Sequence, residues 1–588
     1  MIRYRISFGD RRHHAVDVSA WLPSAPAAAL ELILPVWAPG SYLVRDFARN
    51  VERLVAADGA GRPLAVEKTA KHRWRIAPDG AREVRVDWRV YARRMSVQEC
   101  FVDADLAILH LAALLPAVAG REREPHRLEI DAPAEWARLE VPLERLAGEP
   151  AAFLAADYDA LLDAPVYAGN GIARDFEVAG AGYRLVDDGG AGIWDGERAA
   201  ADLAAIAAEE QRLWGAVPFR RYLFLNLLHG DGGSGLEHRD STVLLADPFR
   251  TRARKAYLGW LGLAAHELFH AWNVKRLRPV ELGPFDYERE NYTRSLWVAE
   301  GVTSYYDDLL VRRAGLATDA EYLAFLSEHL ERHENRPGRE VQPLADASFD
   351  TWIRFYRPDE TTANTQVSYY VKGALVAWLL DVEIRRASGG ERTLDDLLRA
   401  AWERFAGERG FAETELRALA GEIAGRDLEA FFRHAVDGTG ALDYAPALDW
   451  YGLRFAPAEE QPAPGEAKPK KGWLGARFEA GGLAVAEVRR GSPGWEAGLS
   501  PGDELVAIDG LRVRADGLDA RLEAYPPGTP ARLLVARRLR MTELAVVFGA
   551  EPAARWKLES DPAAAPEAVA RRQAWFAPSR SAVAAPVA

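Results

Sequence analysis

Two histidines and a glutamate have the types and the spacing to bind a metal ion and use it in catalysis. His266, Glu267 and His270 lie in LGLAAHELFHAWNVKRL, where apolar residues recur at helical spacing. Residues four apart share one face of a helix, so both imidazoles can reach the same ion, as tetrahedral zinc requires. Glu267 lies beside that face and could take a proton from water. The pattern predicts a catalytic zinc site, with packed or helix-capping histidines as the alternative.

A catalytic zinc site needs a third protein ligand, and Glu300 is the candidate. It lies in SLWVAEGVTSYYDDLLVRRAG, an amphipathic stretch with apolar neighbours that predict a buried carboxylate in need of a partner. Cys100 is the only cysteine in the chain, which excludes a cysteine-rich zinc site and an intramolecular disulfide. Asp307 and Asp308 could orient the metal ligands or form a solvated acidic pair.

The elements that must position these residues follow from changes of pattern along the chain. Residues 1–168 contain alternating runs such as RYRISF and VRVDWRVYA, which are typical of a β-rich domain. Within residues 169–456 the sequence becomes rich in Ala, Leu and Glu at helical spacing. The segment RYLFLNLLHG and the glycine-rich DGGSGLEHRDSTVLL predict a strand, a turn and a strand beside these helices. We expect that hairpin to form an edge of the active site.

The pattern of the last part of the chain predicts a linker, a small domain and a tail. Residues 457–471 are rich in Pro, Ala and charge, as in a semi-rigid linker. Residues 472–550 contain strand-like runs, tight turns and one short helix, which together indicate a compact module. Residues 551–588 are predicted to be a C-terminal tail with one or two helical turns.

Composition and charge limit the partners and the location of the protein. Among 588 residues, 87 are acidic and 74 are Lys or Arg, which gives a formal net charge of −13. No basic patch stands out, so no nucleic-acid partner is expected. No window of about twenty residues is both apolar and free of charge, and the N-terminus lacks the apolar run of a signal peptide. We expect a cytoplasmic protein without a membrane partner.

The motif HELFH followed by WVAEGVTSYY resembles the gluzincin zinc metallopeptidases. The wider chain, including LPVWAPGSYLVRDFARNV near the N-terminus, resembles the glycyl aminopeptidase family, which joins such a domain to a PDZ domain. The resemblance implies a multidomain α+β protein. Its parts would be a β-sandwich-like domain at 1–168, a thermolysin-like catalytic domain at 169–456 and a PDZ domain at 472–550. It also implies one Zn²⁺ ion and the removal of N-terminal Gly or Ala from peptides with a free N-terminus.

Two further motifs of these families have counterparts here. Their Gly-x-Met-Glu-Asn strand, whose glutamate faces the substrate amine, corresponds to Gly235-Leu236-Glu237-His238, with Leu and His as departures. Their Tyr-x-Lys-Gly segment, whose tyrosine donates to the oxyanion, corresponds to the segment beginning at Tyr370. The resemblance therefore assigns Gly235 and Glu237 to substrate binding and Tyr370 to catalysis. Tyr369 is the competing substrate-side tyrosine, because adjacent helical residues point about 100° apart.

In the C-terminal module, Gly472-Trp473-Leu474-Gly475 resembles the PDZ loop whose backbone N–H groups receive a peptide carboxylate. Such a groove either binds peptide C-termini or serves only to dock the module. Two other interpretations of the whole chain remain. One is a zinc endopeptidase. The other is a PDZ peptide-binding protein whose metallopeptidase domain is vestigial, although a complete set of ligands and base argues against it.

Overall fold

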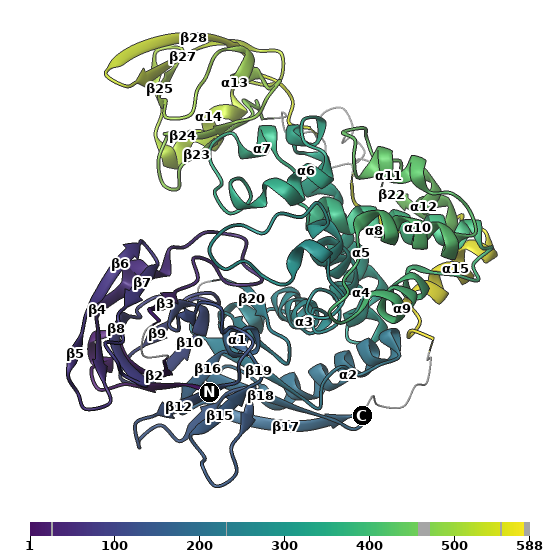
Figure 1. Cartoon of the computed structure of the whole chain (residues 1–588). Helices are drawn as coiled ribbons and strands as arrows, with labels where there is room; N and C mark the ends of the chain where they lie inside the picture. Colours follow the sequence, from purple (N-terminus) through teal and green to yellow (C-terminus); the bar gives the residue numbers. More distant parts are fainter. Residues whose placement is uncertain (25–27, 231, 457–470, 553–555, 581–588) are drawn as a thin grey trace.

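The computed structural model describes residues 1–24, 28–230, 232–456, 471–552 and 556–580. It confirms the predicted multidomain α+β architecture: a β-rich N-terminal domain, a largely helical body and a C-terminal PDZ domain (Figure 1). The predicted linker 457–471 lies, except for Lys471, outside the described residues.

The N-terminal domain is built from β-sheets around one apolar core. In β8 (Glu83–Tyr91) the residues Val84, Val86, Trp88 and Val90 are buried and alternate with polar ones, as expected for a strand with one solvated face. The largest sheet has the order β14-β15-β12-β1-β2-β8-β4-β5, and two four-stranded sheets have the orders β11-β3-β7-β6 and β13-β16-β10-β9. The strands are β1 (Ile2–Ser7), β2 (Ala15–Pro23), β3 (Leu30–Ile33), β4 (Val51–Asp58), β5 (Pro63–Leu64), β6 (Val66–Ala70), β7 (Arg73–Ile76), β9 (Phe101–Val102), β10 (Ala107–Leu109), β11 (Ala117–Val118), β12 (His126–Asp131), β13 (Arg138–Glu140), β14 (Glu144–Arg145), β15 (Ala152–Ala155) and β16 (Val166–Gly169).

The catalytic domain opens with a five-stranded sheet in the order β17-β18-β19-β21-β20. Its strands are β17 (Ile172–Val178), β18 (Ala181–Gly189), β19 (Arg221–Leu228), β20 (Ser234–Glu237) and β21 (Ser241–Leu245). Helix α2 (Gly196–Trp214) connects the parallel strands β18 and β19. Strand β20 pairs antiparallel with β21 and forms the edge of the sheet, next to α3 in Figure 1.

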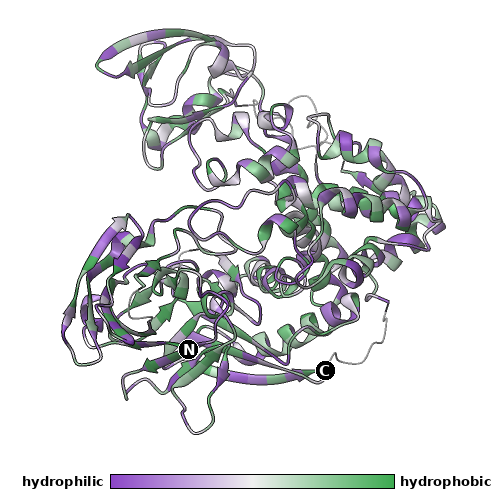
Figure 2. Ribbon diagram, viewed as in Figure 1, coloured by the Kyte–Doolittle hydropathy of each residue, from purple (hydrophilic) through white to green (hydrophobic). Residues whose placement is uncertain are grey.

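Three central segments carry the candidate metal site. They are α3 (Arg254–Phe269), a π-helical turn (Trp297–Val302) that continues into α4 (Thr303–Arg313), and α8 (Val371–Ala387). Their residues are mainly apolar and buried, and Figure 2 shows this part of the helical body largely green. The surrounding helices are α5 (Asp319–Glu334), α6 (Leu344–Phe349), α7 (Thr362–Thr365), α9 (Leu394–Phe405), α10 (Glu413–Ala424), α11 (Glu429–Ala435) and α12 (Ala445–Tyr451), and α1 (Tyr158–Leu162) belongs to the N-terminal domain.

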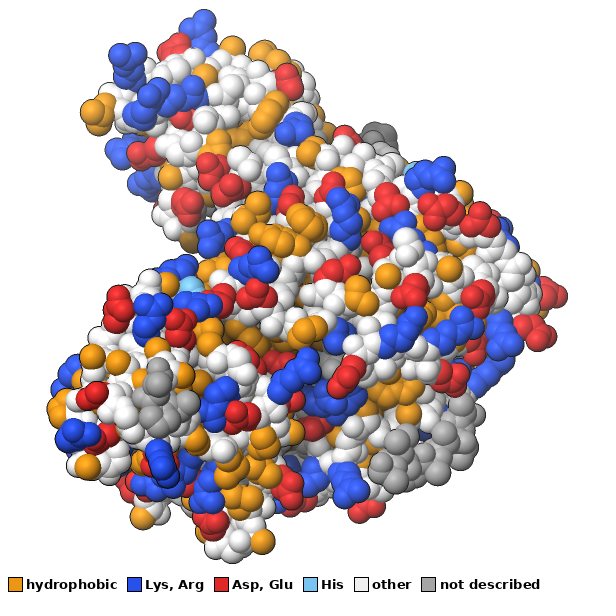
Figure 3. All heavy atoms as spheres, in the orientation of Figure 1, with side chains coloured by type: hydrophobic (Ala, Val, Ile, Leu, Met, Phe, Trp, Pro, Cys, Tyr) orange, Lys and Arg blue, Asp and Glu red, His pale blue; other side chains and the backbone are white. Residues whose placement is uncertain are grey.

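The PDZ domain is inserted into the catalytic domain. The strand before it, β22 (Leu453–Phe455), pairs antiparallel with the strand after it, β29 (Leu558–Ser560). Figure 3 shows the domain as a separate lobe with an open notch between it and the N-terminal domain. Its elements are β23 (Ala476–Phe478), β24 (Val485–Val488), α13 (Pro493–Glu496), β25 (Glu504–Ile508), β26 (Leu511–Arg512), α14 (Leu518–Glu523), β27 (Pro530–Arg537) and β28 (Arg540–Val547).

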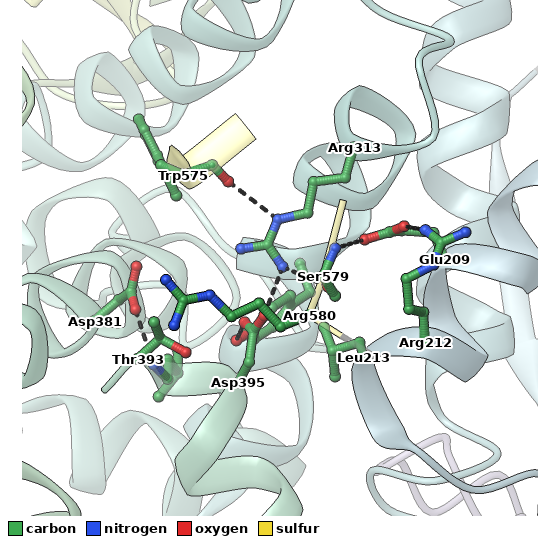
Figure 4. Close-up of polar contacts among 12 residues, drawn as sticks. Glu209, Arg212, Leu213, Arg313, Asp381, Thr393, Asp395, Trp575, Ser579 and Arg580 are labelled. Carbon is green, nitrogen blue, oxygen red and sulfur yellow. Dashed lines mark hydrogen bonds and ion pairs between the residues drawn. The ribbon is translucent and has the colours of Figure 1, made fainter. Parts of the chain in front are cut away.

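The C-terminal segment returns to the catalytic domain, whereas the sequence had indicated a tail at 551–588. Helix α15 (Pro566–Phe576) buries Trp575, whose ring stacks on Tyr451 with centroids 4.2 Å apart. Arg313 donates to the Trp575 carbonyl over 3.1 Å and to Ser579 Oγ over 2.9 Å (Figure 4). The adjacent aromatic side chains of Trp575 and Phe576 are both buried, and this burial stabilises the docked segment although the sequence around them is of low complexity.

Among the helices of the described residues, none combines the length and the apolarity that a membrane span requires.

Candidate metal centre

The structure brings His266, His270 and Glu300 together, and all three side chains are buried. Oε2 of Glu300 lies 3.3 Å from Nε2 of His266 and 3.2 Å from Nε2 of His270. Ligands at the corners of a tetrahedron around zinc, with bonds of about 2.0–2.1 Å, are separated by about 3.3 Å. The Glu300 oxygen therefore lies at this spacing from both imidazole nitrogens, and the three donor atoms all lie within 4.8 Å of one another, as a metal site with one corner open requires.

The second nitrogen of each imidazole is engaged elsewhere, which leaves Nε2 for a metal. Nδ1 of His266 lies 3.1 Å from Oδ2 of Asp307, and Nδ1 of His270 lies 2.8 Å from the carbonyl of Asn273. The Asn273 amide in turn donates to the carbonyl of Val298 over 2.9 Å. Such outer partners fix the tautomer and the orientation of a ligating histidine. The sequence suggested Asp307 or Asp308 for this role, and it is Asp307 that contacts His266.

Glu300 is held by the π-helical turn, a local widening of the helix that is frequent at functional sites. Burial opposes its charge, but His270 and His266 lower the pKa of the carboxyl below its usual range. The Glu300 side chain is therefore held in its anionic form.

Glu267 lies beside these donors with its Oε2 atom buried and without a hydrogen-bond partner among the described residues. Burial raises the pKa of Glu267, and the charges of Glu237 and Glu300 raise it further. A β carbon on Gly235 of strand β20 would lie 2.2 Å from Oε1 of Glu267. Gly235 thus provides the space that the Glu267 carboxylate occupies.

Glu237 lies at the end of β20, and one of its oxygens is within 4.8 Å of donor atoms of Glu267 and His270. Its side chain is buried, and Oε1 has no hydrogen-bond partner among the described residues. A β carbon on Gly40, in the N-terminal domain, would lie 2.6 Å from each oxygen of this carboxylate. Glu237 forms no salt bridge within 4.0 Å among the described residues, and the nearby charge of Lys275 is already held by its salt bridge to Asp163.

The two adjacent tyrosines face different surroundings. The Tyr370 ring lies over the His266 ring at 6.1 Å between centroids, with an angle of 29° between the planes. The Tyr369 hydroxyl is buried and lies 3.0 Å from Oγ1 of Thr351, away from the imidazoles. Tyr370 is thus the tyrosine next to the metal-binding cluster.

Family models match most of the segments that form this site. The model described as M61 glycyl aminopeptidase matches residues 259–376, the M61 N-terminal domain model matches residues 3–170, and a PDZ model matches residues 485–537. The crystal structure of an aminopeptidase N family protein from Idiomarina loihiensis is 31% identical, with a TM-score of 0.90, and the match covers 98% of this chain and 100% of that one. The chain belongs to the M61 glycyl aminopeptidase family.

As a member of the M61 family, the chain is a peptidase. His266, His270 and Glu300 are a buried group of side chains that could hold a metal ion. An M1 zinc metallopeptidase from Deinococcus radiodurans is 14% identical, with a TM-score of 0.47 over 75% of this chain and 94% of that one. No curated protein matches the chain. Gly235 and Glu237 lie between the segments that the M61 models match.

Some residues of the site were not predicted from the sequence. Gly40 and Asp163 reach it from the N-terminal domain, and Lys275 reaches it from the segment after the HELFH helix. Gly40 has a φ of +86°, which glycine adopts readily, and the Pro-Gly pair that precedes Ser41 is its sequence signal. Asp163 and Lys275 have no such sequence signal, because these two partners lie 112 residues apart in the chain.

In the PDZ domain of this M61 protein, Leu474 points into the domain core and Gly475 has a φ of +70°. Trp473 exchanges two backbone hydrogen bonds of 3.0 Å with Gly549. The backbone N–H groups of Leu474 and Gly475 have no hydrogen-bond partner among the described residues. The three predicted loop residues therefore lie together at the start of β23.

Proposed function

We propose that this M61 protein is a zinc-dependent aminopeptidase that removes small N-terminal residues, Gly or Ala, from peptides. The buried carboxylate of Glu237 carries the proposal. A buried carboxylate without a salt-bridge partner is costly, and a cationic ligand can supply the missing contact. A substrate ammonium group is such a ligand, and Glu237 lies within reach of the metal-binding cluster.

The ion would be held by His266, His270 and Glu300. The Glu300 oxygen lies at tetrahedral spacing from Nε2 of both histidines, and Nδ1 of each histidine already has a hydrogen-bond partner. Two imidazoles and one carboxylate suit zinc, with one position left open. When bound, zinc supplies Lewis acidity, which polarises the substrate carbonyl and makes water more acidic.

Residues of the chain would supply the base, the hydrogen bond to the oxyanion and the alignment of the substrate. The raised pKa of Glu267 suits a base that takes the proton of the attacking water and passes it to the leaving amine. The Tyr370 hydroxyl would donate a hydrogen bond to the oxygen that gains negative charge. The free edge of β20 would pair with the substrate backbone and align the first peptide bond.

The preference for Gly or Ala is supported by the filled space beside Glu237. Gly40 contacts the carboxylate, and Tyr42 is 2% exposed with its ring 5.7 Å from that of Trp352. A large first side chain would have to displace these groups, and overpacking of this kind is unfavourable.

Hydrolysis of Gly- and Ala-anilides, each compared with its N-acetylated form, tests the proposal. We expect cleavage of the free-amine substrates only, and we expect Glu237→Gln to lose at least tenfold in kcat/KM on them. Glu210→Gln is the matched control: Glu210 is also buried without a partner, but burial raises its pKa well above the usual range, so the amide replaces a neutral acid. Equal cleavage of acetylated substrates would reject the aminopeptidase and favour an endopeptidase.

A second function, binding of peptide C-termini by the PDZ domain, is supported by the free N–H groups of Leu474 and Gly475. Strand β23 pairs only with β24 among the described strands, so a peptide can add to its other edge. Peptides with a free C-terminal carboxylate should bind at least tenfold more tightly than their amides. Equal binding of both forms would reject this role. Peptide binding by a protein that hydrolyses no anilide would favour the vestigial-domain interpretation.

A further inference from the structure

The turn that follows Glu237 is held by a carboxylate of the other domain. Asp163, directly after α1 of the N-terminal domain, accepts a hydrogen bond from the backbone N–H of Arg239 over 2.6 Å. Its Oδ1 atom lies 3.2 Å from Nδ1 of His238 and accepts from Nζ of Lys275 over 2.9 Å. Burial opposes the charge of Asp163, but Lys275 and His238 together bring its pKa well below the usual range. Asp163 is therefore ionised and has three donors.

His238 stands where the related motif has asparagine, and its ring lies between groups of the N-terminal domain. Besides the contact with Asp163, the ring stacks on His110 at 5.8 Å with an angle of 21°. The backbone N–H of His238 donates to the carbonyl of Ser241 over 2.9 Å and closes the turn between β20 and β21. The orientation of the residue next to Glu237 is thus set from outside the catalytic domain.

The same turn is tied to the end of the metal-binding helix. Arg276 donates to the carbonyl of Arg239 over 2.8 Å and to Oδ1 of Asp240 over 2.7 Å. The backbone N–H of Lys275 donates to the carbonyl of His270 over 3.0 Å. One set of contacts therefore connects the end of the helix that carries His266 and His270, the turn after Glu237, and the N-terminal domain.

Gly40 confines the Glu237 carboxylate from the opposite side. Its loop is anchored on the catalytic domain, since Val36 N–H donates to the carbonyl of Tyr287 and the Trp37 indole to that of Asp286, each over 2.9 Å. A β carbon at Gly40 would lie 2.6 Å from both Glu237 oxygens, closer than real side chains approach. The carboxylate has little freedom to move between Gly40 and the turn.

We propose that the N-terminal domain completes the amine-binding subsite, with Asp163 as a positioning residue that acts through His238 on Glu237 and with Gly40 closing the subsite. This inference rests on the proposed aminopeptidase function. It assigns the selection of a free N-terminus to both domains together. A substrate ammonium needs its carboxylate in a fixed place for a charge-assisted contact, so a displaced Glu237 should weaken substrate binding and raise KM.

The test compares Ala-anilide with the propionyl anilide, which lacks only the amino group, in the full-length zinc-loaded protein. Asp163→Asn should raise KM for Ala-anilide at least tenfold, with kcat within threefold of wild type and zinc content unchanged. Asp159→Asn is the matched control, because Asp159 lies on the same α1 and accepts from the Tyr287 hydroxyl of the catalytic domain without touching the turn. It should leave KM unchanged.

His238→Ala serves as a second variant if Asp163→Asn does not fold, since it leaves Asp163 with its other two donors. It should show the same rise in KM. An unchanged preference for Ala-anilide in either folded variant overturns the inference, and so does an equal loss in Asp159→Asn. If wild type cleaves both anilides equally, the proposed aminopeptidase function fails first and the inference falls with it.

Discussion

Gly301 and Gly373 face each other where the π-helical turn crosses the start of α8. A β carbon on Gly373 would lie 2.8 Å from Cα of Gly301, and one on Gly301 would lie 2.7 Å from the carbonyl oxygen of Tyr369. The crossing brings Glu300, the proposed metal ligand, and Tyr370 onto neighbouring backbones. Two glycines are therefore needed for the tyrosine to reach the metal-binding cluster.

Gly373→Ala should separate these backbones. We expect destabilisation by about 1–3 kcal/mol, the usual cost of overpacking, and a loss of at least tenfold in kcat. Gly259→Ala, on the open face of α3 with no atom within 4 Å of the added carbon, should instead stabilise the protein by about 0.5–1 kcal/mol. Thermal unfolding and steady-state kinetics measure both. Full activity in Gly373→Ala would mean that the crossing does not position Tyr370.

Tyr370 and Tyr369 should differ in their importance for catalysis. Tyr370→Phe removes a hydrogen-bond donor from the reacting oxygen and should lower kcat by about 10²–10³. Tyr369→Phe removes the hydroxyl contacts with Thr351 and Tyr356, and it should cost about 1 kcal/mol of stability with kcat nearly unchanged. Measurement of kcat on Ala-anilide for both variants decides between them. A larger kinetic loss in Tyr369→Phe would reverse the assignment.

Asp307 should control metal affinity. Asp307→Asn weakens the partner of His266 Nδ1 and should reduce zinc affinity by about 10–100-fold. Asp308→Asn should have little effect, because burial and the neighbouring Asp307 raise the pKa of Asp308 well above its usual range, so that it is already neutral. Competition with a chelator measures both affinities. Equal affinities in the two variants would contradict the role of Asp307.

Lys372 should reduce stability at neutral pH. Its Nζ donates to the carbonyl of Gly438 over 3.2 Å, and burial lowers its pKa from 10.5 to about 8. Between these values the unfolded chain binds more protons than the folded one, so stability rises with pH across that window and the cost is full below pH 8. The shift corresponds to about 3 kcal/mol.

Lys372→Met should therefore stabilise the protein at pH 7 by about 2 kcal/mol after loss of the hydrogen bond, and the gain should vanish above pH 10.5. Unfolding measured at both pH values tests this. A stability gain that does not depend on pH would show that burial does not lower the pKa of Lys372 in the folded protein.

The sequence was sufficient to predict those parts of the site that one helix or one short motif carries. The pair His266 and His270 is visible because helical spacing alone places both on one face. Glu300 required the expectation of a third ligand, and the structure brings it to the pair. The contacts of Asp163 with Lys275 and of Gly40 with Glu237 join segments distant in sequence, which no local pattern encodes. The docking of α15 was missed because only Trp575 and Phe576 signal it in an Ala-rich stretch.

The proposed mechanism depends most on Glu267, which would act as the base of a zinc aminopeptidase. The most direct measurement is the hydrolysis of Ala-anilide by wild type and by Glu267→Gln, with the zinc content of each determined on the same samples. The account predicts one zinc per chain in both proteins and a loss of at least about 10²-fold in kcat in the variant. A Glu267→Gln protein that retains both its zinc and its activity would contradict the account.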